Sequence, residues 1–295
     1  MSHFWRDQIV ENLCNLLFRH FNIRLHRKML KCIKKYKSYR INNEMEQEKV
    51  ALLIPCTSKN RNWSNIKESY LYNLTLKTFL LTCDKEHSYT FYIGIDRNDP
   101  IFDNVANQEE ISRFNKVFNK LNFVFIYMDD IQKGHLTKMW NVLFARAYED
   151  ECEYFFQCGD DIYFATNGWV NDCIRVLKKY SGFGLVGPIN NNTRILTQAF
   201  VSRRHMEIFG WFFPEEIINW CCDDWYNLVY QPSLFFPLHN HYCDNQGGEP
   251  RYDIDGQTDF AENSRMKLRK LREDTGILAN KHRVHMANKI KELKK

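Results

Sequence analysis

The sequence predicts an α/β fold in which a mainly parallel central sheet is flanked by helices, with a helical arm at each end of the chain. Short continuous apolar runs, typical of strands that are buried on both faces, alternate with stretches of helical periodicity. Polar side chains follow four of these runs, as they do where strands end at a ligand-binding edge. The 295 residues are 44% hydrophobic and 15% aromatic, which is enough for a large core.

The expected elements follow one another as strand, helix, strand through the first half of the chain. Residues 136–147 have the i, i+3, i+4, i+7 apolar spacing of an amphipathic helix. This alternation implies βαβ units and therefore a parallel sheet. The strands are expected at 50–55, 89–95, 123–127, 154–158, 184–187 and 233–241, and the helices at 66–81, 109–121, 136–147, 170–180 and 215–230.

Charge divides the chain into three expected parts: a basic helical arm at 1–47, a body at 48–260 and a basic helical tail at 261–295. Residues 1–40 and 265–295 each carry a net charge of +8, while residues 41–264 carry −11. An acidic body argues against a nucleic-acid-binding core and suits a site that collects divalent cations. We expect the basic ends to be solvated helices packed on the body; contact with an anionic membrane or an acidic partner is the alternative.

The ten cysteines are scattered and form no C-x-x-C pair, so a structural zinc site is poorly supported and a reducing compartment is the simpler expectation. No apolar run approaches the roughly 18 residues of a membrane-spanning helix, and the N-terminal residues lack the pattern of a secretory signal. We therefore expect a cytoplasmic protein, with peripheral membrane contact as the alternative.

Polar groups follow the first four expected strands. Strand one runs into a turn that contains Pro55, Thr57 and Arg61, and strand two runs into Asp96. Strands three and four end in paired aspartates. In open α/β sheets ligands bind beyond the carboxyl ends of the strands, so these groups predict a site for a polar, phosphorylated ligand.

The pair Asp160-Asp161 after strand four is the most informative of these groups. Two adjacent carboxylates repel each other unless a cation or hydrogen-bond donors compensate. Magnesium and manganese prefer oxygen ligands together with substrate phosphates, and Gly159 would let the backbone approach a ligand closely. An ordinary solvated acidic turn is the alternative, but the position after an aromatic strand favours a metal.

The stretch from Glu153 to Phe164 resembles the metal-binding signature of A-type-fold (GT-A) glycosyltransferases, and the order of elements is similar over roughly residues 50–245. The resemblance implies a GT-A-like fold with a Rossmann-like nucleotide-binding half, a nucleotide-sugar donor, and Mn²⁺ or Mg²⁺ on its diphosphate. Glycine here takes the first place of the usual acidic-any-acidic pattern. The resemblance therefore implies Asp161 as the direct metal ligand, and Asp160 as a second ligand or a contact to the sugar.

The resemblance extends to segments that would hold the donor. The turn that begins at Pro55 resembles the family's nucleotide-binding loop, and Asp96 matches the carboxylate that contacts the nucleobase or ribose. The helix at 136–147 resembles the donor-lining segment, which would place Lys138 near phosphate and Asn141 near the ribose or sugar. An ordinary exposed helix position is the alternative for Lys138.

The pair Asp223-Asp224 is the candidate for catalysis. In the family, an acidic residue at a helix start acts as general base in inverting enzymes, taking the proton of the acceptor hydroxyl. We expect Asp224 in this role, with Asp223 as the other choice, and capping of the following helix as the plainer explanation. The neighbouring Trp220 and Trp225 are candidates for stacking on sugar faces or for the core.

Two histidines, His239 and His241, complete the candidate site. The spacing predicts that both imidazoles lie on the same side of a strand. The family often adds a late histidine to the metal, which implies His241 or His239 as a further ligand. The polar loop at 187–193 is a candidate for the acceptor.

We therefore predict a metal-dependent hexosyl- or related transferase that moves a sugar from a UDP- or GDP-linked donor to a hydroxyl of a glycan, protein or lipid. Two other classes remain open: a nucleotidyltransferase or metal-dependent phosphohydrolase, which would need a second acidic cluster, and a catalytically silent nucleotide-sugar-binding module. Nucleic acid is not expected as a partner.

Overall fold

The computed structural model describes residues 47–248, 251 and 262–294. The predicted N-terminal arm lies almost wholly outside the described residues, as do short parts of the predicted body and tail. Residues from Gln47 onward form one compact unit, and in its described part no helix is both long and apolar enough to cross a bilayer.

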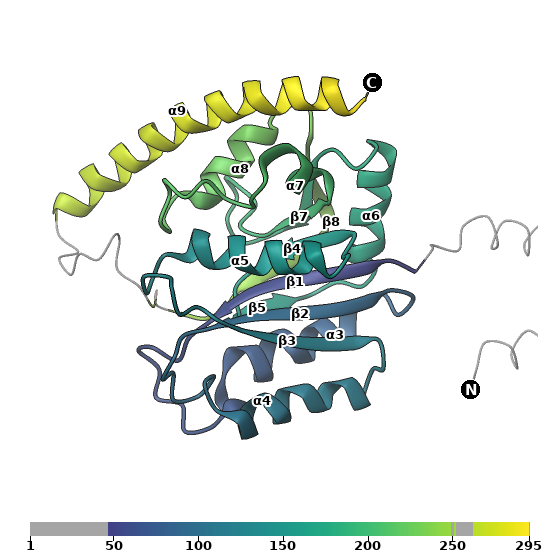
Figure 1. Ribbon diagram of the computed structural model, residues 1–295, viewed down its shortest axis with the longest axis vertical. Coiled ribbons are helices and arrows are strands. Elements are labelled where there is room, and N and C mark those ends of the chain that lie inside the picture. The colour runs from purple at the N-terminus through teal and green to yellow at the C-terminus, as the bar shows by residue number, and fades with distance from the viewer. Residues whose placement is uncertain (1–46, 249–250, 252–261, 295) are drawn as a thin grey trace, which may run out of the picture. The chain divides into compact units, whose positions relative to one another are not determined.

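One curled sheet of eight strands, mostly parallel, forms the centre of this unit (Figure 1), in the order β3-β2-β1-β4-β7-β6-β8-β5. Its strands β1 to β4 are parallel, whereas β7 joins β4 and β6 in antiparallel pairs. At the far end β8 is parallel to β6 and antiparallel to β5. The bounds are β1 Lys49–Cys56, β2 Ser88–Ile95, β3 Leu121–Tyr127, β4 Tyr154–Gln157, β5 Ile162–Phe164, β6 Leu185–Ile189, β7 Ala199–Ser202 and β8 Phe235–Asn245.

Helices cover both faces of the sheet. On one face α5 packs on β1 and β4, and α7, α8 and α9 continue this layer (Figure 1). On the other face α3 and α6 meet through the rings of Phe79 and Trp169. The bounds are α3 Lys77–Thr82, α4 Val105–Ser112, α5 Leu136–Glu149, α6 Trp169–Lys179, α7 Arg204–Phe209, α8 Cys222–Tyr230 and α9 Glu262–Leu293, with short 3-10 helices η1 Ile66–Glu68 and η3 Arg113–Lys116 and a π-helix η2 Leu71–Leu76.

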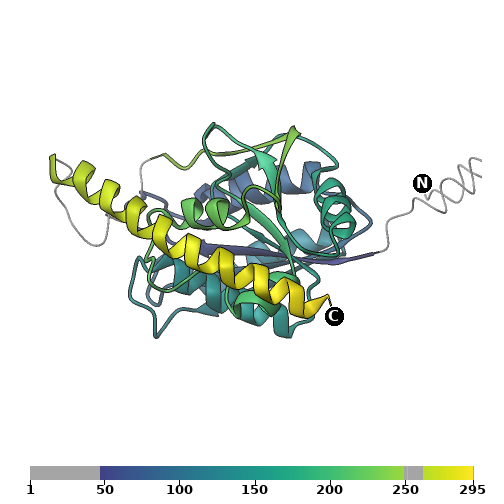
Figure 2. The same cartoon turned by 90° about the horizontal axis from the view of Figure 1, so that it is seen from above.

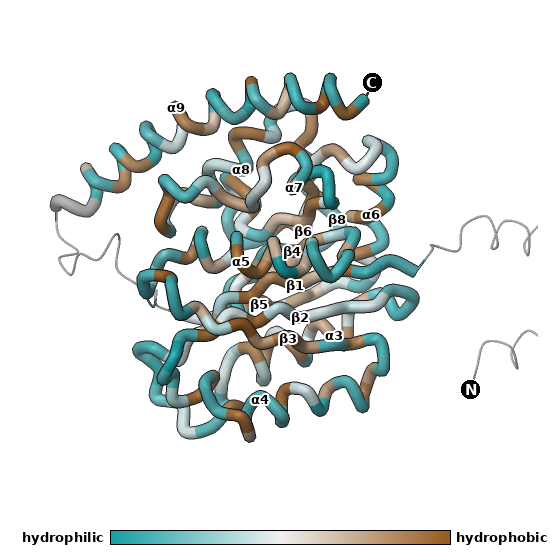
Figure 3. The backbone as a smooth tube through the Cα atoms, in the orientation of Figure 1, coloured by the Kyte–Doolittle hydropathy of each residue, from teal (hydrophilic) through white to brown (hydrophobic). Residues whose placement is uncertain are grey.

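The strands β1 and β4 confirm the prediction made from continuous apolar runs. Residues 50–57 and 154–158 are all buried, because β1 and β4 have helices on both faces. In Figure 3, hydrophobic residues gather in the strands at the centre of the sheet, and hydrophilic residues are frequent in the outer helices and turns. Parallel pairing brings the carboxyl ends of β1 and β4 to one edge, which is where the polar turns follow.

Several boundaries differ from the prediction. The segment 215–221 is not helical, and α8 begins only at Cys222, because Cys221 has a left-handed backbone with φ of 70°. The strands β5 and β7 and the helix α7 were not expected, since three to six residues are too few to show a periodicity. The helix expected at 109–121 begins earlier, at Val105, and gives way to a 3-10 turn at Arg113.

The last helix, α9, packs on α8 and α7 and runs across the molecule (Figure 2). Its His282 Nδ1 accepts a hydrogen bond of 3.0 Å from Trp225 Nε1, and Arg283 Nε donates to the Leu228 carbonyl at 3.1 Å. His285 Nε2 lies 2.8 Å from the Ile208 carbonyl oxygen. The basic C-terminal helix therefore packs on the body through its later part, where Ala279 and Met286 are buried in the core.

Candidate functional site

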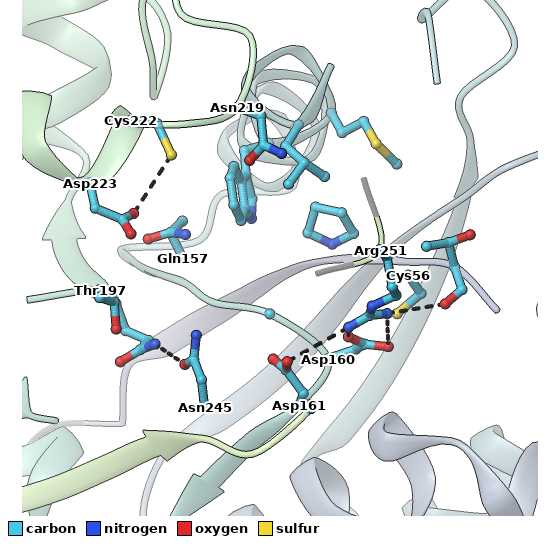
Figure 4. A pocket seen from close by; sticks show the side chains of 18 of the residues that line it. Cys56, Gln157, Asp160, Asp161, Thr197, Asn219, Cys222, Asp223, Asn245 and Arg251 are labelled. Atoms are coloured by element: carbon cyan, nitrogen blue, oxygen red, sulfur yellow. Dashed lines mark hydrogen bonds and ion pairs between the residues drawn. The ribbon is translucent and has the colours of Figure 1, made fainter. Parts of the chain in front are cut away.

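A pocket of about 370 Å³ opens at the carboxyl ends of β1 and β4 (Figure 4). Its size falls in the range of small-molecule sites. The walls come from six separate stretches of the sequence. They are formed by Pro55, Cys56, Thr57 and Arg61 at the end of β1 and in the turn after it; Leu136, Met139 and Trp140 of α5; Gln157 and Gly159–Asp161 at the end of β4; Thr197 and Gln198 before β7; Asn219–Asp223 leading into α8; and Asn245, Gly247, Gly248 and Arg251 at the end of β8 and after it.

Asp160 is fully buried beside the pocket and forms an ion pair with Arg251. Both carboxylate oxygens accept from the guanidinium, one of them at 2.8 Å, and Arg251 also donates to the Thr57 carbonyl at 3.0 Å. The backbone of this turn is held by Thr75, whose hydroxyl donates to the Asp160 carbonyl at 2.7 Å and accepts from Ile162 N at 2.9 Å. Arg251 thus supplies a cation that an adjacent pair of carboxylates needs.

Asp161 lies in a slot between two glycines. A Cβ at Gly247 would stand 2.7 Å from Asp161 Cβ, so this position excludes a side chain. A Cβ at Gly159 would stand 2.5 Å from Asp161 Oδ1 and would push the carboxylate aside. Burial and the neighbouring Asp160 raise the pKa of Asp161 to about 6, against the opposing effect of Arg251. Its carboxylate faces the pocket (Figure 4), and Arg251 Nη2 is 3.8 Å away.

The donors present allow a divalent cation to be held chiefly through Asp161. Within the described ranges no group of three or more His, Cys, Asp and Glu side chains converges on one point. Magnesium, however, is usually bound by one or two carboxylates together with substrate phosphates. The carboxylate of Asp161 is open to the pocket and could bind a metal ion directly. Both carboxylate oxygens of Asp160 accept hydrogen bonds from Arg251, so Asp160 could bind the ion only if Arg251 moved aside.

The two predicted histidine ligands lie elsewhere. β8 has a bulge at this point, because Pro188 pairs with Leu238 and Ile189 already pairs with Tyr242. The bulge breaks the two-residue alternation, so the prediction that both imidazoles share a side is wrong: His239 is exposed and His241 is buried. His241 bonds Asp172 at 2.8 Å and Thr166 at 3.1 Å, and neither histidine lines the pocket.

Of the acidic pair at the start of α8, the structure brings Asp223 to the pocket and not the preferred Asp224. Asp224 forms an ion pair with Arg194. Asp223 accepts hydrogen bonds from the Tyr226 hydroxyl at 3.2 Å and from Cys222 Sγ at 3.6 Å. Burial raises the pKa of Asp223 to about 7, with the nearby Asp224 adding to this and the Tyr226 bond opposing it. A carboxyl poised near neutral pH suits general acid–base work.

The turn after β1 is held in place by Asp99. Its carboxylate accepts from Ser58 N at 2.7 Å, from the Ser58 hydroxyl at 2.8 Å and from the Thr57 hydroxyl at 3.3 Å. The predicted Pro55 and Thr57 line the pocket, so this carboxylate positions one of its walls. Asp96 is buried at the end of β2 and is not part of the lining.

The remaining predicted donor-binding residues separate into two groups. Arg61 lines the pocket and donates from Nη2 to the Gly247 carbonyl at 2.8 Å. Lys138 instead pairs with Glu215 at 3.3 Å. Asn141 bridges α5 to a loop, since its oxygen accepts from Phe213 N at 2.8 Å and its nitrogen donates to the Phe213 carbonyl at 2.8 Å. Lys138 and Asn141 do not line the pocket.

Sequence reasoning missed Arg251, Gln157 and Gly247 as parts of the site. Arg251 is 91 residues from its partner Asp160, so local spacing carries no sign of the pair. Gln157 belongs to the apolar run of β4, where a lone polar residue at the end of a buried strand was the available signal. The short segment Gly247-Gly248 after β8 was a weaker signal of close backbone approach.

The sequence matches no family model and no curated protein. Its fold is similar to solved structures of TarS from S. aureus. TarS 1–349 in complex with UDP-GlcNAc matches with a TM-score of 0.50 and 13% identity, over 82% of this chain and 72% of that one. TarS 1–349 without a stated ligand gives a TM-score of 0.48 at 12% identity, over 82% and 71%.

A structure of a longer TarS chain matches with a TM-score of 0.44 and 13% identity. The match covers 66% of this chain and 36% of that one, so this chain corresponds to about a third of the longer TarS. At these identities the likeness concerns the fold alone. The chain therefore has a mixed α/β fold shared with the TarS 1–349 that was crystallised with UDP-GlcNAc.

Proposed function

We propose that this protein is a glycosyltransferase that moves a sugar from a UDP- or GDP-linked donor to an acceptor hydroxyl with inversion. The observation that carries the proposal is the placement of Asp161 and Asp223 in one pocket at the carboxyl edge of the sheet. One carboxylate is suited to the diphosphate end of a donor and the other to proton transfer. The fold shared with TarS 1–349 in its UDP-GlcNAc complex supports the same class.

The diphosphate end of the pocket is the one with Asp160, Asp161, Arg61 and Arg251. Arg61 and Arg251 place two guanidinium groups there, and such forks suit phosphate oxygens. A Mn²⁺ or Mg²⁺ ion held by Asp161 would add charge neutralisation on the leaving diphosphate. The two arginines orient the diphosphate, so that negative charge appearing on it during transfer meets positive charge already in place.

Asp223 is the proposed general base. The acceptor oxygen attacks the anomeric carbon while the bond from that carbon to the diphosphate oxygen breaks. The hydroxyl proton passes to Asp223, and the nucleoside diphosphate leaves with the electron pair of the broken bond. The pKa of about 7 for Asp223 lets it be ionised before the step and hold the proton after it. This assigns to Asp223 the role that the sequence suggested for Asp224.

A two-metal phosphohydrolase or nucleotidyltransferase is less well supported. That chemistry needs a second acidic cluster beside the first. Across the described residues no cluster of three or more potential ligands forms, and Arg251 already engages Asp160. We expect the acceptor to be a hydroxyl of a glycan, a protein or a lipid.

The test is a panel of UDP- and GDP-sugars assayed for release of nucleoside diphosphate, with and without Mn²⁺. We expect one donor to be cleaved, and Asp161→Asn and Asp223→Asn each to lower the rate by about 100-fold or more. Asp224→Asn is the matched control, since that carboxylate lies outside the pocket lining. If a donor binds but no nucleoside diphosphate is released, the catalytically silent binding module is favoured. If Asp161→Asn retains both donor binding and nucleotide release, the proposal is overturned.

A further inference from the structure

The described basic side chains that line the pocket all lie at one of its ends. Only two basic side chains, Arg61 and Arg251, occur among the described residues that line it. Both belong to the end with Asp160 and Asp161: Arg251 pairs with Asp160, and Arg61 bonds the carbonyl of Gly247, whose Cα abuts Asp161. In Figure 4, Gln157 and Asp223 lie toward the other end.

Gln157 and Trp220, which both line the pocket, each carry a buried polar atom without a hydrogen-bond partner in the described structure. Gln157 is 2% exposed, and its Oε1 accepts no bond. Trp220 Nε1, also shielded from solvent, donates none. Leaving such atoms unpaired costs about 1–3 kcal/mol each, so buried polar atoms are expected to find partners. Both residues line the pocket, where one lacks a donor and the other lacks an acceptor.

A sugar ring supplies both. Each hydroxyl can donate one hydrogen bond and accept others, and the indole of Trp220 offers an apolar face beside its N–H. Gln157 is the last residue of β4, three positions before Asp160, so a group bonded to Gln157 is close to a diphosphate bound at Asp161. In a nucleotide-sugar, the group directly attached to the diphosphate is the transferred sugar.

Resting on the proposed function, we propose that this end binds the transferred sugar as a neutral, hydroxyl-bearing ring. Gln157 Oε1 accepts a hydrogen bond from a sugar hydroxyl, and Trp220 Nε1 donates one to a sugar oxygen. A sugar carboxylate is disfavoured here, because it would approach Asp223 with no cation among the described lining residues at this end to compensate. We therefore expect a uronic acid conjugate to bind more weakly than its neutral counterpart.

The test compares the binding of UDP, UDP-glucose, UDP-galactose, UDP-N-acetylglucosamine and UDP-glucuronic acid, with GDP and GDP-mannose in parallel, by calorimetry. UDP-glucose and UDP-glucuronic acid form a matched pair that differs by one carboxylate in place of one hydroxymethyl group. We expect a neutral conjugate to bind at least about tenfold more tightly than both its free diphosphate and the uronic acid conjugate.

Gln157→Leu should lower the affinity for that neutral conjugate by about tenfold and leave the affinity for the free diphosphate unchanged. Trp220→Phe, which keeps the apolar ring face, should also lower the affinity for the conjugate. Gln198→Leu is the matched control. Gln198 is equally buried in the same pocket, but its amide is bonded inside the protein to Asn245 and Cys243. Gln198→Leu should change the affinity for the free diphosphate and the affinity for the neutral conjugate by the same factor.

The outcomes separate the two proposals. If neither UDP nor GDP binds, the proposed function fails and this subsite fails with it. If a diphosphate binds but no neutral conjugate binds more tightly, if the uronic acid conjugate binds as well, or if Gln157→Leu weakens diphosphate and conjugate equally, the sugar subsite is overturned while the nucleotide site stands.

Discussion

Replacing Asp223 by asparagine should stabilise the protein and lower its transfer activity by about 100-fold or more. Burial raises the pKa of this carboxyl from 3.8 to about 7 in the folded protein. Below pH 3.8 the carboxyl is protonated in both folded and unfolded chains. As the pH rises toward 7, the unfolded chain ionises first, so the folded wild type loses stability until Asp223 ionises too. Above pH 7 the loss is complete and constant.

The size of the effect follows from the same pKa. A pKa raised from 3.8 to about 7 corresponds to at most about 4 kcal/mol, and up to about 3 kcal/mol of it falls between pH 5 and pH 8. The value is an upper limit because the side chain is partly open to the pocket. Asparagine never ionises and can still accept the Tyr226 hydrogen bond, so its advantage over aspartate should grow across this interval.

Urea unfolding of wild type and Asp223→Asn at pH 5, 6, 7 and 8 measures the effect directly. The reasoning fails if the two stability curves run parallel over this range. Asp224→Asn is the control: it removes an ion pair whose arginine is half exposed, so it should cost at most about 1 kcal/mol and retain transfer. Transfer by Asp223→Asn should fall by about 100-fold or more at pH 8, although that protein is then the more stable one.

Three further substitutions test the packing around the site. Gly247→Ala places a methyl group 2.7 Å from Asp161 Cβ and should reduce the affinity for Mn²⁺, measured by calorimetry. An unchanged affinity would show that the position of Asp161 does not depend on the space at Gly247. Gly276→Ala meets no atom within 4 Å inside α9 and should raise stability by about 1 kcal/mol in thermal unfolding, so a loss would contradict the open helix surface. Thr75→Val leaves Ile162 N without its acceptor and should cost about 1–3 kcal/mol in urea; a neutral result would show that the turn does not depend on this hydroxyl.

The central strands were predictable because β1 and β4 are buried on both faces, and complete burial leaves a continuous apolar run in the sequence. The same edge-of-sheet argument located Asp161, Thr57 and Arg61 in the pocket. These predictions depend only on local sequence and on the rule that parallel strands end together. The strands β5 and β7 are too short to carry such a pattern.

Other features of the site depend on distant parts of the chain. Adjacent residues on a helix point about 100° apart, so the sequence could not show which of Asp223 and Asp224 faces the pocket. The position of His241 depends on a bulge set by the pairing of β8 with β6. Arg251 reaches Asp160 across 91 residues. Each of these contacts is decided by tertiary packing, for which one sequence alone holds no local signal.

The contacts between α9 and α8 connect the C-terminal end of the chain to the position of the proposed catalytic base. α8 begins with Cys222 and Asp223 and is fastened to α9 through Trp225 and His282. In a chain shortened to end before α9, the face of α8 that packs on α9 would be exposed to solvent. α8 would then no longer be held in place, and neither would Asp223, the proposed base. Removal of the chain from residue 262 onward should therefore lower the rate of transfer more than it lowers the affinity for the diphosphate, so that the C-terminal helix affects turnover separately from donor binding.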